Sequence, residues 1–419
     1  MNAEAGMGAN LKYNRTTRIW VMRRTLFITT IALSTLTVGA RAQSPYYPPA
    51  GSWEHRKAEQ VGLTARAGDS AVAIAKASES TTPRDLHEAQ RITFGREPYG
   101  EITGPFQGRS GAAGLIIKSG YIVAEWGDPD REETTHSVTK SFVTTTVGLA
   151  FDRGMIHDIT DPVRSYMAPI VAQKNQAGMF ETLEPFESEH NRKITWEHLL
   201  RQSSDWQGTL WGKPDWADRF RPGSDSNQVK VRARNEPGSV YTYNDVRVNL
   251  MALASLNVWR RPLPQVLKDL VMDPIGASNT WRWCGYDNSW VVMDGQLVQS
   301  VAGGGHWGGG MIISARDMAR FGYLTLRNGK WRDKQLISAK WIAMSRSPGP
   351  ANDSYGFANY FLNTGRKAMP DAPETAFYHL GNGNNIIYVD QANDLVVVAR
   401  WMNSVRSMNA MVKVLTAKP

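Results

Sequence analysis

The chain of 419 residues contains a single cysteine, Cys284. One thiol cannot form an intrachain disulfide or a thiolate metal cluster. Because this cysteine lies far from the N-terminus, it also cannot be the acylated N-terminal cysteine of a lipoprotein. The eight histidines include no His-Glu-x-x-His motif and no close pair that would hold a catalytic zinc ion. The sequence therefore predicts no metal and no cofactor.

Basic stretches are also scarce outside the N-terminal region. The formal net charge is +9, but six of the basic residues lie within the first 42 positions. No later basic run is interleaved with aromatic residues, as it is in many nucleic-acid-binding proteins. The glycine-rich residues 303–310 lack the Lys-Ser/Thr that completes a phosphate-binding loop, so we expect close backbone packing there. We therefore expect a small-molecule partner and no nucleic acid.

The apolar run near the N-terminus is too short to span a membrane. Residues 26–38 are interrupted by threonine and serine and fall short of the roughly 20 apolar residues that a span needs. Basic residues precede the run, and Ala40-Arg41-Ala42 follows it, which is the pattern of a secretory signal peptide. We expect residues 1–42 to be removed, leaving an exported, periplasmic or secreted protein with no stable membrane span. The sequence leaves open whether Met1 or Met22 is the start.

Strand-like patterns lie towards both ends of the remaining chain. Apolar runs at residues 113–118 and 121–126 flank Ser119-Gly120 and predict a β-hairpin. Runs at residues 385–389 and 395–401 predict a second pair of strands, and a final helix should follow from about Val405. Few strand-like runs occur between them. This order predicts an α+β domain in which an antiparallel sheet is interrupted by a helical region.

The domain boundaries follow from the same patterns. We expect an N-terminal linker and helical extension at residues 43–110, followed by one domain at residues 111–419. The inserted helical region should occupy residues 151–300. The sequence gives no indication of the oligomeric state.

A hydroxyl and an amine lie three residues apart in Ser137-Val138-Thr139-Lys140, at the predicted start of a buried helix. On a helix this spacing places both groups on one face. A serine beside a lysine is a known arrangement for activating a nucleophile. A chain this rich in serine should contain about one such pair by chance. A capped helix start with a solvated lysine is therefore the alternative, and the surrounding sequence must decide.

Four further motifs follow this pair in a fixed order. They are ITWEHLLRQSSD at residues 194–205, PGSVYTYND at 237–245, GGGMIISARD at 308–317 and HLG at 379–381. With these motifs the chain resembles the β-lactamase-related serine hydrolases. That family includes class C β-lactamases, D-alanyl-D-alanine carboxypeptidases, family VIII esterases and 6-aminohexanoate-oligomer hydrolases. The resemblance covers residues 111–401. It implies an α/β (α+β), β-lactamase/transpeptidase-like fold in which an antiparallel sheet is flanked by helices, with the active site between the sheet and an inserted all-helical region.

The resemblance assigns Ser137 as the nucleophile, Lys140 as the adjacent lysine and Tyr243 as the tyrosine of a Tyr-x-Asn motif. Free lysine and tyrosine have pKa values of about 10.4 and 10, so neither is a base at neutral pH without a shift of roughly three units. A protonated Lys140 would stabilise a Tyr243 phenolate, which would take the Ser137 proton and return it to the leaving group. A core tyrosine with a satisfied hydroxyl is the alternative for Tyr243.

Two positions depart from the family pattern. Asp245 stands where the family has asparagine, and a carboxylate there would hold the lysine charged, unless Asp245 serves only as a helix N-cap. His379 stands in place of the usual lysine in the motif that ends at Gly381, so the fixed cation of β-lactamases and peptidases is missing. His379 could equally be structural. The resemblance places an oxyanion-hole N–H at Asn382, beside that of the nucleophile.

These residues predict a serine hydrolase that cleaves a small ester or amide through an acyl-enzyme. A D-alanyl-D-alanine carboxypeptidase or a β-lactamase is the alternative within the enzyme class. A non-turnover acylated sensor or an inert binding fold is the alternative outside it. Three tryptophans, Trp206, Trp211 and Trp216, either line an apolar substrate pocket or belong to the core. The sequence does not identify the acyl group, the leaving group or the physiological role.

Overall fold

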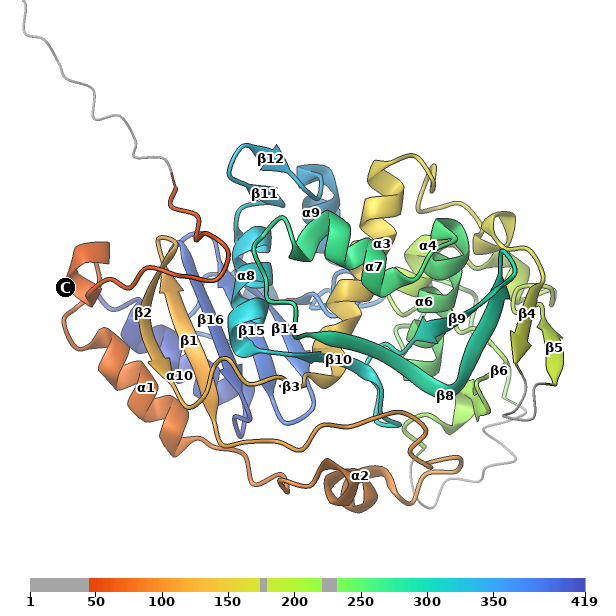
Figure 1. Ribbon diagram of the computed structural model, residues 1–419, viewed down its shortest axis with the longest axis horizontal. Helices are drawn as coiled ribbons and strands as arrows, with labels where there is room; N and C mark the ends of the chain where they lie inside the picture. Colours follow the sequence, from red (N-terminus) through yellow and green to blue (C-terminus); the bar gives the residue numbers. More distant parts are fainter. Residues whose placement is uncertain (1–44, 174–178, 221–231, 419) are drawn as a thin grey trace, which may run out of the picture. The chain divides into compact units, whose positions relative to one another are not determined.

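A six-stranded antiparallel sheet joins the two ends of the chain in the computed structural model, which describes residues 45–173, 179–220 and 232–418 (Figure 1). The strand order is β13-β14-β15-β16-β1-β2. The strands are β13 Phe361–Leu362, β14 Phe377–Gly381, β15 Asn385–Asp390, β16 Leu395–Arg400, β1 Ala113–Lys118 and β2 Tyr121–Trp126. Both predicted strand pairs are confirmed, because β1 pairs with β2 and β15 with β16.

Helices cover both faces of this sheet, which is why its central strands β15 and β16 are buried along their whole length and mostly apolar. Successive side chains of a strand point to opposite faces. Leu115 accordingly belongs to the cluster that packs under α8 and α3, and Ile116 to the one under α1 and α10. These helices are α1 Ala67–Ala77, α3 Thr139–Asp152, α8 Ala315–Leu326 and α10 Val405–Leu415. The predicted final helix is therefore present.

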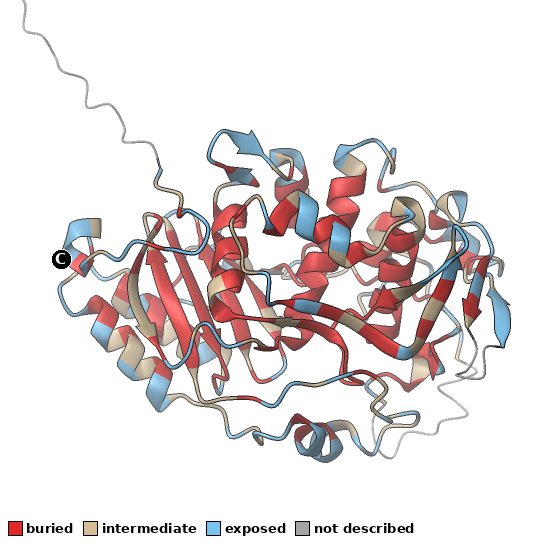
Figure 2. Cartoon of the chain, viewed as in Figure 1, coloured by how far each residue is buried: buried red, intermediate tan, exposed pale blue. Residues whose placement is uncertain are grey.

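Helix α3 carries Lys140 and is enclosed along most of its length. It follows a single 3-10 turn, η2 His136–Val138, and residues 139–150 are all buried (Figure 2). A helix that is enclosed on every side belongs to the interior. The nucleophile candidate Ser137 therefore lies on a rigid element.

A second sheet lies in the region predicted to be all-helical, which corrects that prediction. Its strand order is β3-β10-β8-β4-β5, and β9 also pairs with β8. These strands are β3 Glu133–Thr134, β4 Ile170–Gln173, β5 Phe180–Leu183, β8 Arg282–Met293, β9 Gln296–Val301 and β10 Gly310–Ile313. The register of β8 against β9 shifts between Gly285 and Trp290, around a small and polar segment. This irregularity disrupts the alternation that would have identified the strand from sequence.

The helical part of the insertion packs around α6, which contacts α3. Its helices are α4 Trp196–Leu200, α6 Asp245–Trp259, α7 Leu263–Leu267 and the π-turn η6 Lys268–Met272. The remaining elements are η1 Ala58–Val61, α2 Leu86–Phe94, η3 Val163–Tyr166, η4 Asn191–Lys193, β6 Thr209–Leu210, β7 Lys213–Pro214, η5 Asp215–Ala217, β11 Lys330–Trp331, β12 Lys334–Gln335, α9 Ala339–Ser345 and η7 Thr364–Arg366.

The segment predicted as an N-terminal linker and extension packs against the main domain. Tyr46 stacks on Tyr121 of β2 with ring centroids 4.4 Å apart, and residues 45–419 form one unit. The predicted signal peptide at residues 1–42 lies outside the described residues. Within residues 45–173, 179–220 and 232–418, no helix combines the length and apolarity needed to cross a bilayer.

Candidate active site

A cavity of about 440 Å³ lies where the start of α3, the start of α6, the glycine-rich loop and the end of β14 meet. It is lined by Phe94, His136, Ser137, Arg219, Tyr243, Asp245, Gly304, Gly305, His306, Phe361, Leu380, Gly381, Asn382, Gly383 and Asn384. Five residues singled out from the sequence therefore share one cavity: Ser137, Tyr243, Asp245, Gly381 and Asn382. Lys140 lies directly behind its wall.

The Lys140 ammonium group is fully buried, donates two hydrogen bonds and forms one ion pair. Its Nζ lies 2.8 Å from Ser137 Oγ, 3.2 Å from the Gly303 carbonyl oxygen and 2.7 Å from Asp245 Oδ1. A buried charge is tolerated when it is paired and hydrogen-bonded in this way. Lys140 is thus paired with Asp245 and donates to the serine oxygen.

Tyr243 lies beside the serine in the cavity. Both side chains line it, and the tyrosine ring lies 5.2 Å from Lys140 Nζ and 4.7 Å from Arg219 Cζ. Burial raises the pKa of Tyr243 well above its ordinary value and the Asp245 charge adds to this, while Arg219 and Ser137 act in the opposite direction. A raised pKa contradicts the sequence-based suggestion that Tyr243 is a phenolate before substrate binds. The resting side chain is a neutral phenol.

Asp245 faces the cavity from the first turn of α6. The N-cap of this helix is Asn244, whose side chain accepts from the Arg247 backbone N–H at 3.1 Å, so Asp245 does not serve as the cap. Asp245 Oδ2 lies 3.1 Å from an Arg219 nitrogen and 3.3 Å from His306 Nδ1. Burial alone would raise the pKa of Asp245, but Lys140, Arg219 and His306 hold it well below its usual range. Asp245 is therefore an anion that fixes the lysine charge.

Sequence reasoning missed His306 and Glu97. The His306 ring stacks on Phe94 with centroids 4.2 Å apart, and its Nε2 lies 2.7 Å from Glu97 Oε2. Burial would lower the pKa of His306, but hydrogen bonds to Asp245 and Glu97 raise it to about 9. The imidazolium thus joins two carboxylates. In the sequence, only the position of His306 within a glycine-rich run hinted at a functional role, and nothing singled out Glu97.

These two residues also belong to a possible set of metal ligands. Ligand atoms of Glu97, Asp218 and His306 lie within 4.8 Å of one another. Both ring nitrogens of His306 already face carboxylates, because Nε2 contacts Glu97 and Nδ1 lies 3.7 Å from Asp218. An imidazolium paired with these acids accounts for the cluster without an ion.

The glycine-rich loop packs tightly against the nucleophile turn, as the sequence predicted. Gly304 has φ +75°, and a Cβ atom there would lie 2.0 Å from the His136 carbonyl oxygen and 2.5 Å from Thr139 Oγ1. His136, directly before Ser137, itself has φ +48°, a strained value for a histidine. Only glycine fits against this turn.

The end of β14 reaches the same turn. A Cβ atom on Gly381 would lie 2.2 Å from the Thr135 carbonyl oxygen and 3.2 Å from the Ser137 backbone nitrogen. Asn382 follows and is exposed in the cavity wall. The close approach brings the backbone at Gly381 and Asn382 beside the nucleophile's own N–H.

His379 is not among the residues that line the cavity. It is fully buried, with Nδ1 2.8 Å from Ser141 Oγ and 3.0 Å from the Asn359 carbonyl oxygen. Burial lowers the pKa of His379 to about 4. Strand alternation directs it to the sheet face under α3, while its neighbour Leu380 lines the cavity. The structure therefore corrects the suggestion that this side chain contacts substrate: His379 supports α3 from behind.

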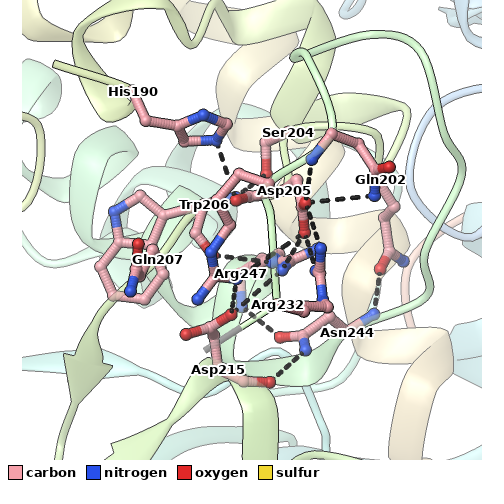
Figure 3. A network of polar contacts seen from close by, with 12 residues as sticks. His190, Gln202, Ser204, Asp205, Trp206, Gln207, Asp215, Arg232, Asn244 and Arg247 are labelled. Carbon is pink, nitrogen blue, oxygen red and sulfur yellow. Dashed lines mark hydrogen bonds and ion pairs between the residues drawn. The ribbon is translucent and has the colours of Figure 1, made fainter. Parts of the chain in front are cut away.

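A buried polar network holds the Tyr243–Asp245 segment in place (Figure 3). Arg247 of α6 contacts Asp205 Oδ1 at 2.7 Å and Asp215 Oδ2 at 3.1 Å. Asn244 donates from its amide to the Asp215 carbonyl oxygen at 2.8 Å, and its backbone N–H donates to Gln202 Oε1 at 2.7 Å. Gln202 and Asp205 belong to the motif at residues 194–205. That motif is thus a support for the catalytic segment rather than part of the cavity wall.

The tryptophans do not form the cavity wall. Trp206 and Trp211 belong to the hydrophobic core, and Trp216 lines a separate cavity beside Asp215. The core interpretation is therefore correct for the first two. The rings that line the candidate site are Phe94 and Phe361, together with Tyr243 and the two imidazoles.

Comparisons with known proteins agree with this geometry. The β-lactamase family profile matches residues 101–412. A family VIII carboxylesterase aligns at 16% identity with a TM-score of 0.52, covering 84% of this chain and 98% of its own. EstCE1, described as a hydrolase with promiscuous acyltransferase activity, aligns at 16% identity with a TM-score of 0.50, covering 84% and 100%. At these identities the solved structures show a shared fold. The search of curated proteins gives no match. Since the family profile spans most of its length, the chain belongs to the β-lactamase family of serine hydrolases.

Proposed function

We propose that this protein cleaves a small ester or amide through an acyl-enzyme on Ser137, with Lys140 and Tyr243 managing the proton. The observation that carries the proposal is the ion pair between Lys140 Nζ and Asp245 Oδ1, which lie 2.7 Å apart. A lysine that this pair keeps protonated has no lone pair to accept the serine proton. Tyr243 lines the same cavity as Ser137 and is the side chain left to move it.

In the first step Ser137 Oγ attacks the substrate carbonyl carbon. Its proton passes to the Tyr243 oxygen while the tyrosine's own proton passes to the leaving oxygen or nitrogen. The scissile bond breaks and an ester to Ser137 forms. This relay never requires a free phenolate, which is consistent with the raised pKa of Tyr243. The Lys140 ammonium stabilises the negative charge that develops on Oγ.

In the second step water attacks the acyl-enzyme. Tyr243 takes a proton from the water and returns one to Ser137 Oγ, so the acid is released and the enzyme is restored. The backbone N–H of Ser137 and that of Asn382 would bind the oxyanion in both steps. The close approach of Gly381 to the Ser137 nitrogen supports this arrangement.

Replacing the nucleophile gives the direct test. Ser137→Ala should reduce the turnover of p-nitrophenyl acetate at least about a thousandfold, because nucleophile and proton relay act as a unit. Its melting temperature should stay close to that of the wild type. Ser141→Ala is a matched control, since Ser141 lies four residues further on, in α3, and bonds to His379 instead. Equal turnover by wild type and Ser137→Ala would refute the proposal.

We also propose that the protein is exported. Support comes from the basic and apolar order of residues 1–42 and from the Ala40-Arg41-Ala42 sequence. When the full chain is expressed with a bacterial secretion system, the mature protein should begin at Gln43. N-terminal sequencing that finds residues 1–42 intact on exported protein would contradict cleavage there.

A further inference from the structure

The active-site cavity presents a cation to solvent. Arg219, two residues after η5, lines the cavity and keeps 38% of its side chain exposed. The other charged groups at the site are enclosed: Lys140 is 0% exposed, Asp245 1% and His306 3%. An incoming substrate therefore meets the guanidinium group before it meets any other charge among the described lining residues.

The Arg219 charge is only partly compensated. Its single hydrogen-bond acceptor among the described residues is Asp245 Oδ2, at 3.1 Å. That carboxylate is shared with Lys140 and His306. Asp218 lies 4.0 Å from Arg219 Nε, beyond hydrogen-bond distance. A guanidinium has five N–H donors. Among residues 45–173, 179–220 and 232–418, several donors of Arg219 thus have no acceptor.

Arg219 lies close to the place where the leaving group of the substrate must bind. Its Cζ lies 4.7 Å from the centroid of the Tyr243 ring, and Tyr243 hands its proton to the leaving group in the proposed relay. The leaving group must come within hydrogen-bond reach of the tyrosine oxygen. Arg219 is therefore adjacent to the leaving group. Phe94 lies on the same side, with its ring centroid 5.8 Å from Arg219 Cζ.

We propose that Arg219 binds a carboxylate on the leaving group, so that the natural substrates are esters or amides of an anionic alcohol or amine, such as a hydroxy acid or an amino acid. This inference rests on the proposed function, because it uses Tyr243 to locate the leaving group. A planar guanidinium can hold a carboxylate through two parallel hydrogen bonds. The Phe94 ring supplies an apolar surface for the body of the same group.

Two isosteric esters test the inference. In 3-carboxyphenyl acetate and 3-carbamoylphenyl acetate the acyl groups are identical and the leaving phenols differ in charge. The wild type should favour the carboxylate ester by about tenfold or more in kcat/KM, the ratio expected for one charge-assisted contact. Arg219→Gln should bring this ratio close to one. Arg219→Lys should retain part of the preference, because lysine keeps the positive charge but cannot donate two parallel hydrogen bonds to one carboxylate.

A matched control and a neutral reporter complete the experiment. Arg164→Gln removes the same charge from an arginine that pairs with Glu187 and does not line the cavity, so it should keep the wild-type ratio. A wild-type ratio near one, or an unchanged ratio in Arg219→Gln, would overturn the inference. If p-nitrophenyl acetate is nevertheless cleaved in a Ser137-dependent manner, the proposed function survives that result. If Ser137→Ala hydrolyses all three esters like the wild type, both fail.

Discussion

At the scale of single residues, the chemistry depends on which group can accept the serine proton. The Lys140 ammonium is fixed by Asp245 at 2.7 Å, and this aspartate stands where the family pattern has asparagine. In the proposed mechanism this carboxylate keeps the lysine a cation rather than a base, and proton transfer then depends on the neutral phenol of Tyr243.

Tyr243→Phe tests this assignment. The variant keeps the ring between Lys140 and Arg219 but removes the oxygen that relays the proton. We expect kcat/KM for p-nitrophenyl acetate to fall by about 10²–10⁴, the usual contribution of general acid–base catalysis. Thermal unfolding should show little loss of stability. A phenylalanine variant with wild-type activity would mean that Lys140 takes the proton after all.

At the scale of elements, three backbone segments are held together at the nucleophile: η2, the glycine-rich loop and the end of β14. Gly304 is the tightest contact between the first two, because a Cβ atom there would meet the His136 carbonyl oxygen at 2.0 Å. The site geometry therefore depends on the absence of a side chain as much as on the catalytic groups.

Gly304→Ala and Gly295→Ala form a matched pair for this contact. Both glycines have positive φ, +75° and +78°, but a Cβ on Gly295 would have no neighbour within 4 Å. The backbone strain alone should cost Gly295→Ala about 1 kcal/mol of unfolding free energy. Gly304→Ala adds a backbone clash and should cost at least about 3 kcal/mol and most of the activity. Equal losses in urea unfolding would contradict the close-contact account.

The elements also show where sequence reasoning succeeds. Strands β1, β2, β15 and β16 are apolar runs bounded by turn residues, so their pattern identified them. The Ser-x-x-Asp pattern within the motif at residues 308–317 is typical of a helix start, and Ser314 accepts from the Asp317 N–H as the N-cap of α8. Strand β8 was missed because its middle contains glycine and polar residues at a register shift. Local patterns predict elements whose burial is continuous, and they fail where pairing is irregular.

At the scale of the whole molecule, distant segments supply parts of one site. Ser137, Lys140, Tyr243 and the 379–381 strand were predicted because each lies in a local motif. Glu97 and His306 were not, because their contact joins residues more than 200 positions apart and neither has a motif of its own. His379 was identified from its motif, but the motif did not predict on which face of the strand its side chain lies. Tertiary packing places it against Ser141 of α3.

The contact between Glu97 and His306 should make stability depend on pH. The folded-state pKa of His306 is raised to about 9, above the value of about 6.5 for free histidine. Its stabilising contribution is thus complete below pH 6.5 and is lost as pH rises through 9. The pKa of the neighbouring Asp218, raised to about 7 by burial and by Asp245, places its titration below pH 8. Burial also lowers the pKa values of Arg320 and Arg400 to about 10, so the contribution of His306 between pH 8 and 10 is read as the difference between wild type and His306→Gln.

We expect the unfolding free energy of the wild type to fall across this window by a few kcal/mol, following about 1.4 kcal/mol for each unit of pKa shift. His306→Gln should be less stable at pH 8 and should show a clearly smaller fall. His157→Gln, which changes an exposed histidine, should follow the wild type. Parallel curves for wild type and His306→Gln would show that the imidazolium does not join the N-terminal segment to the site.

The central claim is that Ser137 is the nucleophile, and covalent labelling tests it most directly. A fluorophosphonate reacts with an activated serine and leaves a stable adduct, which peptide mass spectrometry can locate. The account predicts one adduct per chain, on Ser137, absent from Ser137→Ala and formed much more slowly in Tyr243→Phe. An adduct on another serine, or an unlabelled Ser137 in protein that hydrolyses p-nitrophenyl acetate, would contradict it.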